Sequence, residues 1–382
     1  MRIGIAHSRY LSGSISGENR VVEDEAGLLR EAGHEVFVWS PIPEADSKRE
    51  LLKVGAQSTW SLRATKELSG LATDNDLDVV HFHNLFPLVS PAAVRAVAAE
   101  GVATVMTLHN YRLLCLPAVF VRDERVCEDC LGHIPWRGVV HRCYRGSTLG
   151  SASIALSLSL HRAIGTFDRI NLFFAGSQFV KDKHAQAGID PGRIEVKPNF
   201  VWPLERREGP GEYYLYLGRM SQEKGIDRLV ETWRSIARPL LVVGDGPQLE
   251  EVRANAPENV RFTGGVEPAA IPELVRGARA VMIPSVTYES APRAVLEAYS
   301  AGVPVIASRI GALPEVVEDS VTGVLADPFE AASWPSAVAK LEDDRASETM
   351  GGNAWRRWRD NHSPEQGLKG LEHGYREAME RC

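Results

Sequence analysis

Short runs of apolar residues recur along the chain and are separated by segments of helical length. In the first half, the runs that predict strands are Arg2–His7, Glu35–Trp39, Val79–His83, Thr104–His109 and Leu172–Ala175. A strand buried on both faces has a continuous apolar run rather than an alternation of apolar and polar residues. Alternation of such strands with helices is typical of a parallel sheet with crossover helices.

The same rhythm resumes after the loop Pro198–Gly211, which is rich in Pro, Gly and charged residues. The strands predicted there are Tyr213–Leu217, Leu240–Val243, Val281–Pro284 and Pro304–Ala307. The pattern therefore predicts an α/β protein with two doubly wound domains, residues 1–198 and residues 199–360. Residues 361–382 have a helical composition, and we expect them to pack back across the junction.

Length and composition agree with two ordinary globular domains. The chain has 382 residues, of which 44% are hydrophobic and 24% charged. It carries 43 Lys and Arg against 50 Asp and Glu, and a net charge of -7 does not favour a nucleic-acid partner. No run of about 20 apolar residues and no signal peptide is found, so we expect a cytoplasmic protein. Peripheral contact with a membrane stays open as an alternative, although the net charge does not indicate it.

Two cations occupy a glycine-bounded turn directly after the predicted strand Tyr213–Leu217. The turn is Gly218-Arg219-Met220-Ser221-Gln222-Glu223-Lys224-Gly225. Ligands bind beyond the carboxyl ends of parallel strands, so Arg219 and Lys224 would hold a diphosphate and neutralise charge on a leaving group. The alternative is a solvated basic loop.

Two carboxylates bracket a predicted helix start further along the chain, in Tyr288–Ala298. Pro292 suits a first helical turn, so the helix is expected to begin near Ala291, with free backbone N–H groups that bind an anion. Glu289 precedes that turn and Glu297 lies about two turns along. Carboxylates accept hydrogen bonds from hydroxyls, which suits a polyol ligand on both sides of a phosphate. The alternative is a surface glutamate followed by an ordinary amphipathic helix.

A small-residue turn and a set of histidines follow strands of the first domain. The turn Ser14–Asn19 contains Gly17 and would let the backbone approach a phosphate, although it lacks the G-x-G-x-x-G spacing. His81, His83 and His109 lie at strand ends. A buried histidine is often only a satisfied core residue, and of the three we favour His109 for function.

These motifs together resemble glycosyltransferase family 4. Gly218–Gly225 is similar to the family's G-R-x-x-x-E-K-G signature, and Glu289 to Glu297 to its E-x7-E signature. The resemblance runs over nearly the whole chain and includes, in the family's order, Thr107-Leu108-His109, Lys197-Pro198-Asn199, Gly244–Pro247, Phe262-Thr263-Gly264 and Ala301–Val305. It implies the GT-B fold, two Rossmann-like domains that face a cleft, with nucleotide-sugar donors and retention of configuration.

The resemblance also implies roles for individual residues. His109, Arg219, Lys224 and Glu289 would be catalytic, with His109 facing the donor sugar and Arg219 and Lys224 clamping the diphosphate. Glu297 would hold the ribose. The other implied donor-binding residues are Gly17, Gly218, Gly265, Val266, Ser290, Ala291, Pro292 and Arg293. Many members have Glu-Gly-Phe-Gly where this chain has Glu289-Ser-Ala-Pro, so the resemblance leaves the donor sugar open.

The function expected from the sequence is a retaining hexosyltransferase. It would move a sugar from a nucleoside-diphosphate sugar to a hydroxyl acceptor by front-face substitution, without a cofactor for the chemistry. The acceptor would be a glycan, a lipid-linked saccharide or a small metabolite. Two alternatives stay open, a non-catalytic nucleotide-sugar-binding or scaffold protein and a nucleotide-sugar epimerase.

Four of the five cysteines crowd into an insertion at about residues 115–145. Cys115, Cys127, Cys130 and Cys143 have the spacing C-x11-C-x2-C-x12-C. In a reducing compartment this pattern favours a structural zinc site over disulfides. Free thiols, or a redox or iron–sulfur role, are the alternatives.

Overall fold

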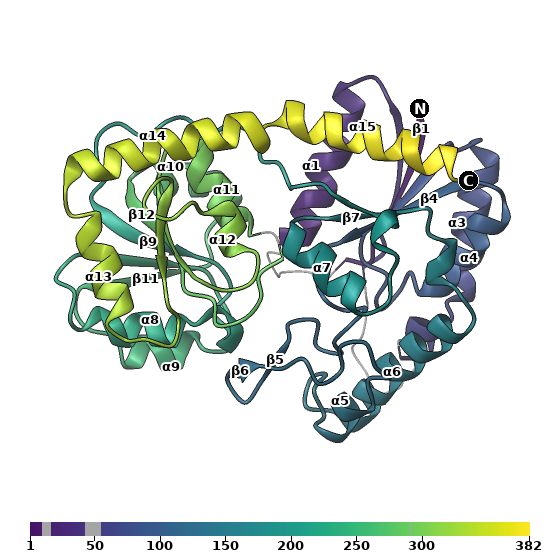
Figure 1. The fold of residues 1–382 in the computed structure, drawn as a ribbon, viewed down its shortest axis with the longest axis horizontal. Coiled ribbons are helices and arrows are strands. Elements are labelled where there is room, and N and C mark those ends of the chain that lie inside the picture. Colours follow the sequence, from purple (N-terminus) through teal and green to yellow (C-terminus); the bar gives the residue numbers. More distant parts are fainter. Residues whose placement is uncertain (10–16, 43–54, 291) are drawn as a thin grey trace. The chain divides into compact units, whose positions relative to one another are not determined.

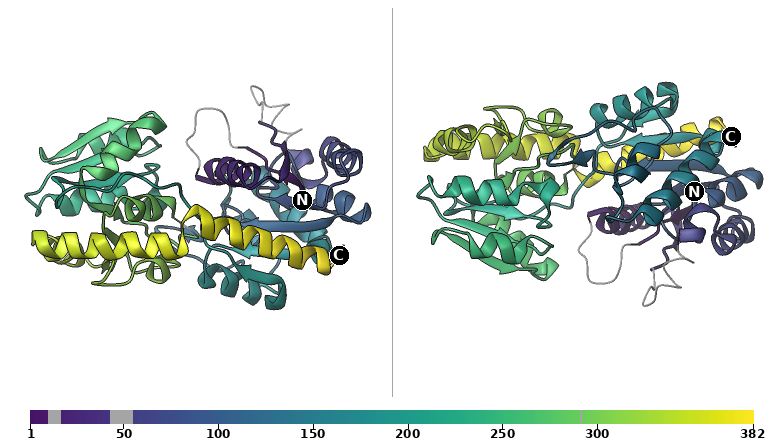
Figure 2. Two further views of the ribbon diagram at one scale, coloured as in Figure 1. Left: turned by 90° about the horizontal axis from the view of Figure 1, so that it is seen from above. Right: turned by 90° about the horizontal axis from the view of Figure 1, so that it is seen from below.

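The computed structural model describes residues 1–9, 17–42, 55–290 and 292–382. It divides into two compact units. The first comprises residues 1–120, 128–198 and 367–382, and the second comprises residues 121–127 and 199–366. Each unit is a parallel sheet with helices on both faces (Figures 1 and 2).

The sheet of the first unit has the strand order β2-β1-β3-β4-β7-β8. All five pairings are parallel. Its strands are β1 (Arg2–Ala6), β2 (Glu35–Trp39), β3 (Val79–Phe82), β4 (Ala103–Leu108), β7 (Leu172–Ala175) and β8 (Ile194–Val196). Its helices are α1 (Gly17–Glu31), α3 (Leu62–Asp74), α4 (Pro91–Ala99), α5 (Trp136–Val140), α6 (Thr148–Ala163), α7 (Gln178–Gln186) and most of α15 (Pro364–Glu380), with the short 3-10 turns Phe167–Arg169 and Pro191–Arg193.

The C-terminal helix completes the core of this first unit. Leu371 and Tyr375 of α15 are buried in one cluster with Val22 of α1 and with Ile5 and Val105 of the central strands. The end of the chain forms the helix α15, and its last 16 residues, 367–382, belong to the first unit. Burial on both faces explains why these strands have continuous apolar runs.

The sheet of the second unit has the order β11-β10-β9-β12-β13-β14, again all parallel. Its strands are β9 (Tyr213–Leu217), β10 (Leu240–Val243), β11 (Val260–Gly264), β12 (Ala278–Ile283), β13 (Val305–Ser308) and β14 (Gly323–Ala326). Its helices are α8 (Ile226–Trp233), α9 (Leu249–Ala254), α10 (Ile271–Arg276), α11 (Arg293–Ser300), α12 (Leu313–Val316), α13 (Ser333–Lys340) and α14 (Asp344–Asn361), with the 3-10 turns Gln222–Lys224 and Pro268–Ala270. Trp233 and Met282 belong to the core on one face, and Tyr299 and Trp358 to the core on the other.

A two-stranded antiparallel hairpin, β5 (Val121–Arg122) and β6 (Arg125–Val126), lies in the cysteine-containing insertion. No helix among the described residues is both long and apolar enough to span a bilayer.

Candidate active site

Two predicted motifs flank the point where the strand order of the second sheet reverses. Strands are added outward in both directions from the central pair β9 and β12. Gly218–Gly225 directly follows β9, and Glu289 follows β12. Loops that leave neighbouring strands on opposite faces form the crevice where open α/β sheets bind ligands. The topology therefore brings the two motifs to the ligand-binding edge.

Glycines allow the two loops to approach each other closely. Gly225 ends the 3-10 turn Gln222–Lys224 with φ of 65° and precedes α8. A Cβ there would lie 2.2 Å from the carbonyl oxygen of Pro284, in the loop after β12. Gly244, after β10, has a similar constraint, since its Cβ would lie 1.9 Å from the carbonyl oxygen of Gly218. Only glycine fits at either position.

Lys224 and Glu289 meet at this edge of the sheet. Lys224 Nζ donates a hydrogen bond to Glu289 Oε1 at 2.6 Å, and Ser285 Oγ donates to the same oxygen. Burial alone would raise the pKa of Glu289, but the charge and hydrogen bond of Lys224 and the bond from Ser285 hold it below its ordinary value. Glu289 is therefore an ionised hydrogen-bond acceptor at neutral pH.

Arg219 lies on the same loop with its guanidinium exposed. Among the described residues its side chain makes no hydrogen bond or ion pair, so it is available to an anion. Its backbone is held in place, because the hydroxyl of buried Tyr216 donates to the Arg219 carbonyl oxygen at 2.7 Å. Burial raises the pKa of Tyr216, so the phenol stays protonated as this donor. The sequence analysis did not identify Tyr216 as a site residue.

The second motif folds with one difference from expectation. Helix α11 begins at Arg293 with Pro292 as its N-cap, whereas the sequence predicted a start near Ala291. Ala291 lies outside the described residues, and Ser290 and Pro292 are partly buried. Pro292 has ψ of 109°, so its backbone is extended and the first helical turn cannot include it.

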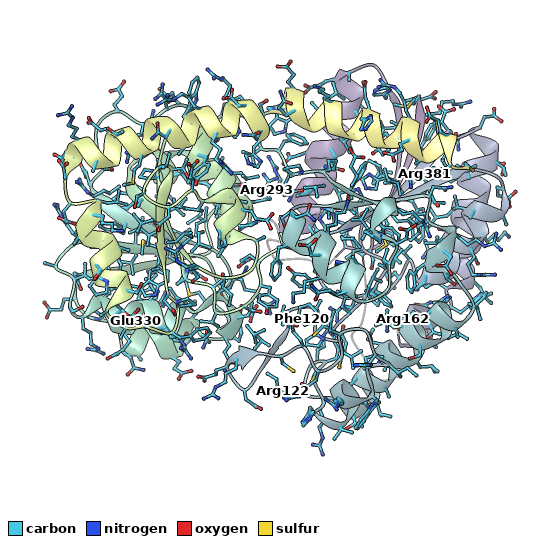
Figure 3. The ribbon with its side chains drawn as sticks, viewed as in Figure 1. Phe120, Arg122, Arg162, Arg293, Glu330 and Arg381 are labelled. Carbon is cyan, nitrogen blue, oxygen red and sulfur yellow. The ribbon has the colours of Figure 1, made fainter. Side chains whose placement is uncertain are left out.

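Arg293 and Glu297 pair along α11, with 3.3 Å between Arg293 Nη2 and Glu297 Oε1 (Arg293 is labelled in Figure 3). Both side chains are largely buried. The remaining predicted residues of this unit, Gly265 and Val266, follow β11. A Cβ on Gly265 would meet no atom within 4 Å, so the backbone is open there, while Val266 packs against the core.

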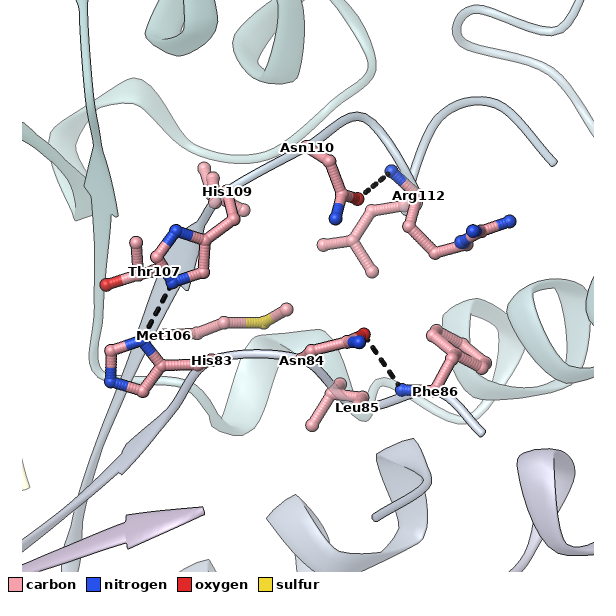
Figure 4. Close-up of a pocket in the computed structure, with 11 residues that line it drawn as sticks. His83, Asn84, Leu85, Phe86, Met106, Thr107, His109, Asn110 and Arg112 are labelled. Carbon is pink, nitrogen blue, oxygen red and sulfur yellow. Dashed lines mark hydrogen bonds between the residues drawn. The ribbon is translucent and has the colours of Figure 1, made fainter. Parts of the chain in front are cut away.

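Two predicted residues, Gly17 and His109, belong to the first unit. Gly17 opens α1, and the preceding residues of its turn, Ser14 to Ser16, lie outside the described residues. His109 follows β4 and lines a small pocket with His83, Asn84 and Arg112 among others (Figure 4).

His83 and His109 are hydrogen-bonded, with 2.7 Å between His83 Nδ1 and His109 Nε2 (Figure 4). Their rings are stacked, and burial, followed by the partner imidazole, lowers the pKa of His109 well below its ordinary value. Glu25 Oε2 lies 3.6 Å from His83 Nε2. A carboxylate there favours the tautomer with the His83 proton on Nε2, so His83 Nδ1 accepts from His109 Nε2–H. His109 is then neutral, with Nδ1 as an acceptor.

A buried group of polar side chains lies behind His83. Lys197 Nζ donates to Glu25 Oε1 at 2.8 Å, and both side chains are almost inaccessible to solvent. His81 Nδ1 lies 3.7 Å from Glu25 Oε2 and is hydrogen-bonded to the hydroxyl of Tyr375 at 2.8 Å. Burial, followed by the charge of neighbouring groups, lowers the pKa of His81 and His83 well below the ordinary value. Lys197 thus supplies the positive charge that balances Glu25.

The pairing of Glu25 with Lys197 was not predicted from the sequence, although the helical period of α1 carried a signal. Glu25 lies on the same face of α1 as the buried residues Val21, Val22 and Leu29. A carboxylate on an apolar stripe requires a partner. Nothing local to α1 indicates that the partner is 172 residues away.

The cysteines of the insertion differ in their environments. Cys115 is buried, and Cys127, Cys130 and Cys143 are partly exposed. Burial raises the pKa of the Cys115 thiol to about 11, and the nearby Cys130 adds to this effect. Cys115 would therefore be a thiolate at neutral pH only beside a cation.

Comparison with known families gives matches in both units. Residues 15–203 match the model described as Glycosyltransferase Family 4, and residues 211–344 match that described as Glycosyl transferases group 1.

Known proteins similar to this chain include two enzymes and one solved structure. A GDP-mannose-dependent alpha-(1-6)-phosphatidylinositol monomannoside mannosyltransferase from Mycobacterium tuberculosis is 31% identical over 243 residues, and the match covers 56% of this chain and only 63% of that protein. A 2-deoxystreptamine glucosyltransferase from Streptomyces kanamyceticus is 28% identical over 337 residues, 83% of this chain and 82% of that protein. The structure of sucrose-phosphate synthase from Thermosynechococcus elongatus superposes with a TM-score of 0.72 at 16% identity, covering 100% of both chains. With the GT-B fold over its full length and family matches in both sheets, the chain belongs to glycosyltransferase family 4.

Proposed function

We propose that this protein transfers a hexosyl group from a nucleoside-diphosphate sugar to a hydroxyl acceptor, with retention of anomeric configuration. The observation that carries the proposal is the contact of 2.6 Å between Lys224 and Glu289, beside the uncommitted cation of Arg219, at the switch point of the second sheet. The name of the matched mannosyltransferase gives GDP-mannose as its donor, which supports a nucleotide-sugar donor for this chain.

The demanding step of such a reaction is departure of the nucleoside diphosphate. The bond between the anomeric carbon and a phosphate oxygen breaks, and the acceptor oxygen forms its bond on the same face of the sugar. The acceptor proton passes to the departing phosphate. Arg219 and Lys224 would stabilise the charge that develops on that phosphate, since fixed cations at a developing anion are worth several kcal/mol in typical active sites. In this proposal, Arg219 and Lys224 are the source of the positive charge that stabilises the departing phosphate.

The carboxylates have a different role in this proposal. Glu289 is ionised and tied to Lys224 and Ser285, so it suits a hydroxyl-binding role better than that of a nucleophile. Glu297, oriented by Arg293, would accept hydrogen bonds from the ribose hydroxyls. His109 would accept a hydroxyl hydrogen bond at Nδ1, because its other nitrogen is committed to His83.

The test combines stereochemistry with matched variants. Purified protein is screened for binding of nucleotide sugars by thermal shift, and turnover of any bound donor is followed by NMR of the anomeric proton. We expect an α-linked product from an α-linked donor. Arg219→Ala and Lys224→Ala should lower kcat at least 100-fold, while Arg234→Ala, an exposed arginine on the outer end of α8, should leave it unchanged.

Each other outcome argues against the proposal. Inversion of configuration would exclude front-face substitution. Near-normal turnover of Arg219→Ala and Lys224→Ala would remove the role of the two cations. Binding of a donor without transfer or hydrolysis, whichever acceptor is added, would favour a nucleotide-sugar-binding scaffold protein. Conversion of the donor sugar into its epimer without transfer would favour an epimerase.

We also propose that Cys115, Cys127, Cys130 and Cys143 hold a structural zinc ion, on the basis of their spacing. A bound zinc ion would lower the pKa of the buried Cys115 thiol and so allow it to act as a thiolate ligand. Protein purified without chelators should contain one zinc per chain, and Cys130→Ser should lower that content and the melting temperature, while Cys382→Ser should change neither. Substoichiometric zinc in the native protein would contradict the site.

A further inference from the structure

Large apolar side chains are exposed on the outer face of helix α6. Leu149 and Leu156 are 76% and 63% exposed, and Leu160 and Ile164 are also exposed. In a helix, positions 149, 156 and 160 lie within about 40° of one another, so they form one stripe. The opposite face packs into the first unit through residues that include Ile154, Leu158 and His161. Helix α6 therefore has two apolar stripes, one packed into the first unit and the other facing solvent.

Exposed apolar side chains on helix α5, and Ile134 just before it, add to this apolar surface. Trp136 and Val140 are 57% and 65% exposed, and Ile134 is exposed as well. Helices α5 and α6 pack against each other within the first unit, and they lie at its rim in Figure 1. Seven exposed large apolar side chains on and beside two packed helices are more than the scattered apolar residues of an ordinary surface, and such a concentration points to an interaction site.

The charge of this region is opposite to that of the whole chain. Residues 131–167 contain four arginines and no aspartate, glutamate or lysine, whereas the chain carries -7. Arg142 and Arg145 are exposed beside α5 and α6, and Arg137 lies 5.7 Å from the Trp136 ring centre and 3.9 Å from Asp129. Arg162 is turned inward, where it donates to backbone carbonyl groups including that of His133 (Figure 3). The net charge therefore conceals a local basic surface.

We propose that α5 and α6 form a docking surface for an anionic lipid bilayer. The apolar stripe of Leu149, Leu156 and Leu160 enters the interfacial region, and Arg142 and Arg145 lie at the level of the headgroups. Exposed tryptophan, an apolar stripe and flanking arginines are the combination that binds in the plane of an anionic membrane interface. A second copy of the chain would be a poorer partner, because two such faces would bring the exposed Arg142 and Arg145 of each copy together.

The experiment is co-sedimentation of the full-length protein with lipid vesicles. One set contains phosphatidylcholine alone, and the other contains phosphatidylcholine and phosphatidylglycerol in equal parts. We expect at least tenfold tighter binding to the anionic vesicles, with a decrease as salt is raised. Leu156→Ser with Leu160→Ser should weaken that binding at least tenfold. Arg142→Gln with Arg145→Gln should reduce it toward the level of neutral vesicles.

Two variants in the second unit serve as controls. Phe329→Ser removes another exposed apolar side chain, and Arg356→Gln another exposed arginine. Both should bind anionic vesicles as the native chain does. All four altered residues of the docking surface are exposed, so equal melting temperatures would exclude unfolding as the cause of a loss.

Three outcomes would overturn the proposal. The first is a failure of the native chain to bind anionic vesicles. The second is binding of both double variants as tight as that of the native chain. The third is a concentration-dependent dimer, seen by light scattering without vesicle binding and abolished by Leu156→Ser with Leu160→Ser, which would assign the surface to self-association. None of these readouts depends on sugar transfer, so the two proposals succeed or fail separately.

Discussion

The buried pair of Glu25 and Lys197 gives the sharpest stability prediction. Lys197→Met keeps the length and apolar stem of the side chain but removes the ammonium group that lies 2.8 Å from Glu25 Oε1. Both side chains are almost fully buried, and Glu25 Oε2 has no hydrogen-bond partner within the described part of the chain. The variant therefore leaves a buried carboxylate without its cation.

Removal of one partner of a buried ion pair costs about 3–5 kcal/mol of unfolding free energy, because an uncompensated charge remains. The first unit has about 200 residues, for which each kcal/mol shifts the melting temperature by roughly 2–4 °C. Lys197→Met should thus lower the melting temperature of that unit by about 6–20 °C. The double variant Glu25→Leu with Lys197→Met should lose less than Lys197→Met alone, since it leaves no charge behind.

The pH dependence provides an independent check of this reasoning. In Lys197→Met, uptake of one proton by the imidazole of His81 or His83 beside Glu25 relieves the unpaired charge. At low pH the folded variant then binds a proton that the folded native protein does not, while the histidines of both unfolded chains titrate alike, so lowering the pH reduces the difference in stability between the variant and the native protein. The destabilisation should therefore be smaller at pH 5.5 than at pH 8.

The assay is calorimetry together with urea unfolding, with the transition of the first unit followed separately if the two units unfold independently. Arg63→Met is the matched control, because Arg63 forms an exposed i,i+4 pair with Glu67 and should change stability by about 0.5 kcal/mol or less. A loss below about 1 kcal/mol in Lys197→Met, or a double variant less stable than Lys197→Met, would refute the argument.

Three further predictions concern the donor loop, acid stability and the free cation. Gly225→Ala should destabilise the second unit by more than about 1 kcal/mol in urea unfolding, because the positive φ and the nearby carbonyl oxygen of Pro284 leave no room for a Cβ. Gly352→Ala is the control, since it adds a Cβ in open space on α14 and should stabilise the unit by about 0.5–1 kcal/mol. Equal effects of the two substitutions would contradict the close approach of Gly225 to Pro284. Burial lowers the pKa of His184 and of His362 from 6.5 to about 4, so the unfolded chain takes up a proton at each histidine before the folded chain does as the pH falls. The free energy of unfolding should therefore fall by about 1.4 kcal/mol per histidine per pH unit between pH 6 and pH 4. A free energy of unfolding that is constant over this range would disprove the prediction. Arg219→Ala should weaken nucleoside-diphosphate binding by isothermal titration without changing the melting temperature, because the side chain is exposed, and a large loss of melting temperature would show a structural role.

Particular elements show how far the sequence pattern reached. Eight of the nine predicted strands, including Tyr213–Leu217 and Leu240–Val243, occur within a residue of the predicted bounds, because burial on both faces gives a continuous apolar run. Strand β11 was missed, since it is at the edge of its sheet and alternates buried and exposed residues, including Arg261 and Thr263. Strand β14 was also missed, because its small end residues Gly323 and Ala326 leave only Val324 and Leu325 as a run of large apolar residues.

The sequence by itself determined the two doubly wound sheets, the loops that carry Arg219, Lys224, Glu289 and Glu297, and the family, because each depends on local periodicity or on residues close together in the chain. Only the tertiary structure decided which strands are neighbours. The order of the second sheet places β9 beside β12, and this brings Lys224 to Glu289 across 65 positions of the chain. Glu25, on α1, and Lys197, directly after β8, likewise meet only in the folded core. Periods of 2 and 3.6 residues report which face of an element is buried, whereas the partner of that face depends on packing over the whole domain.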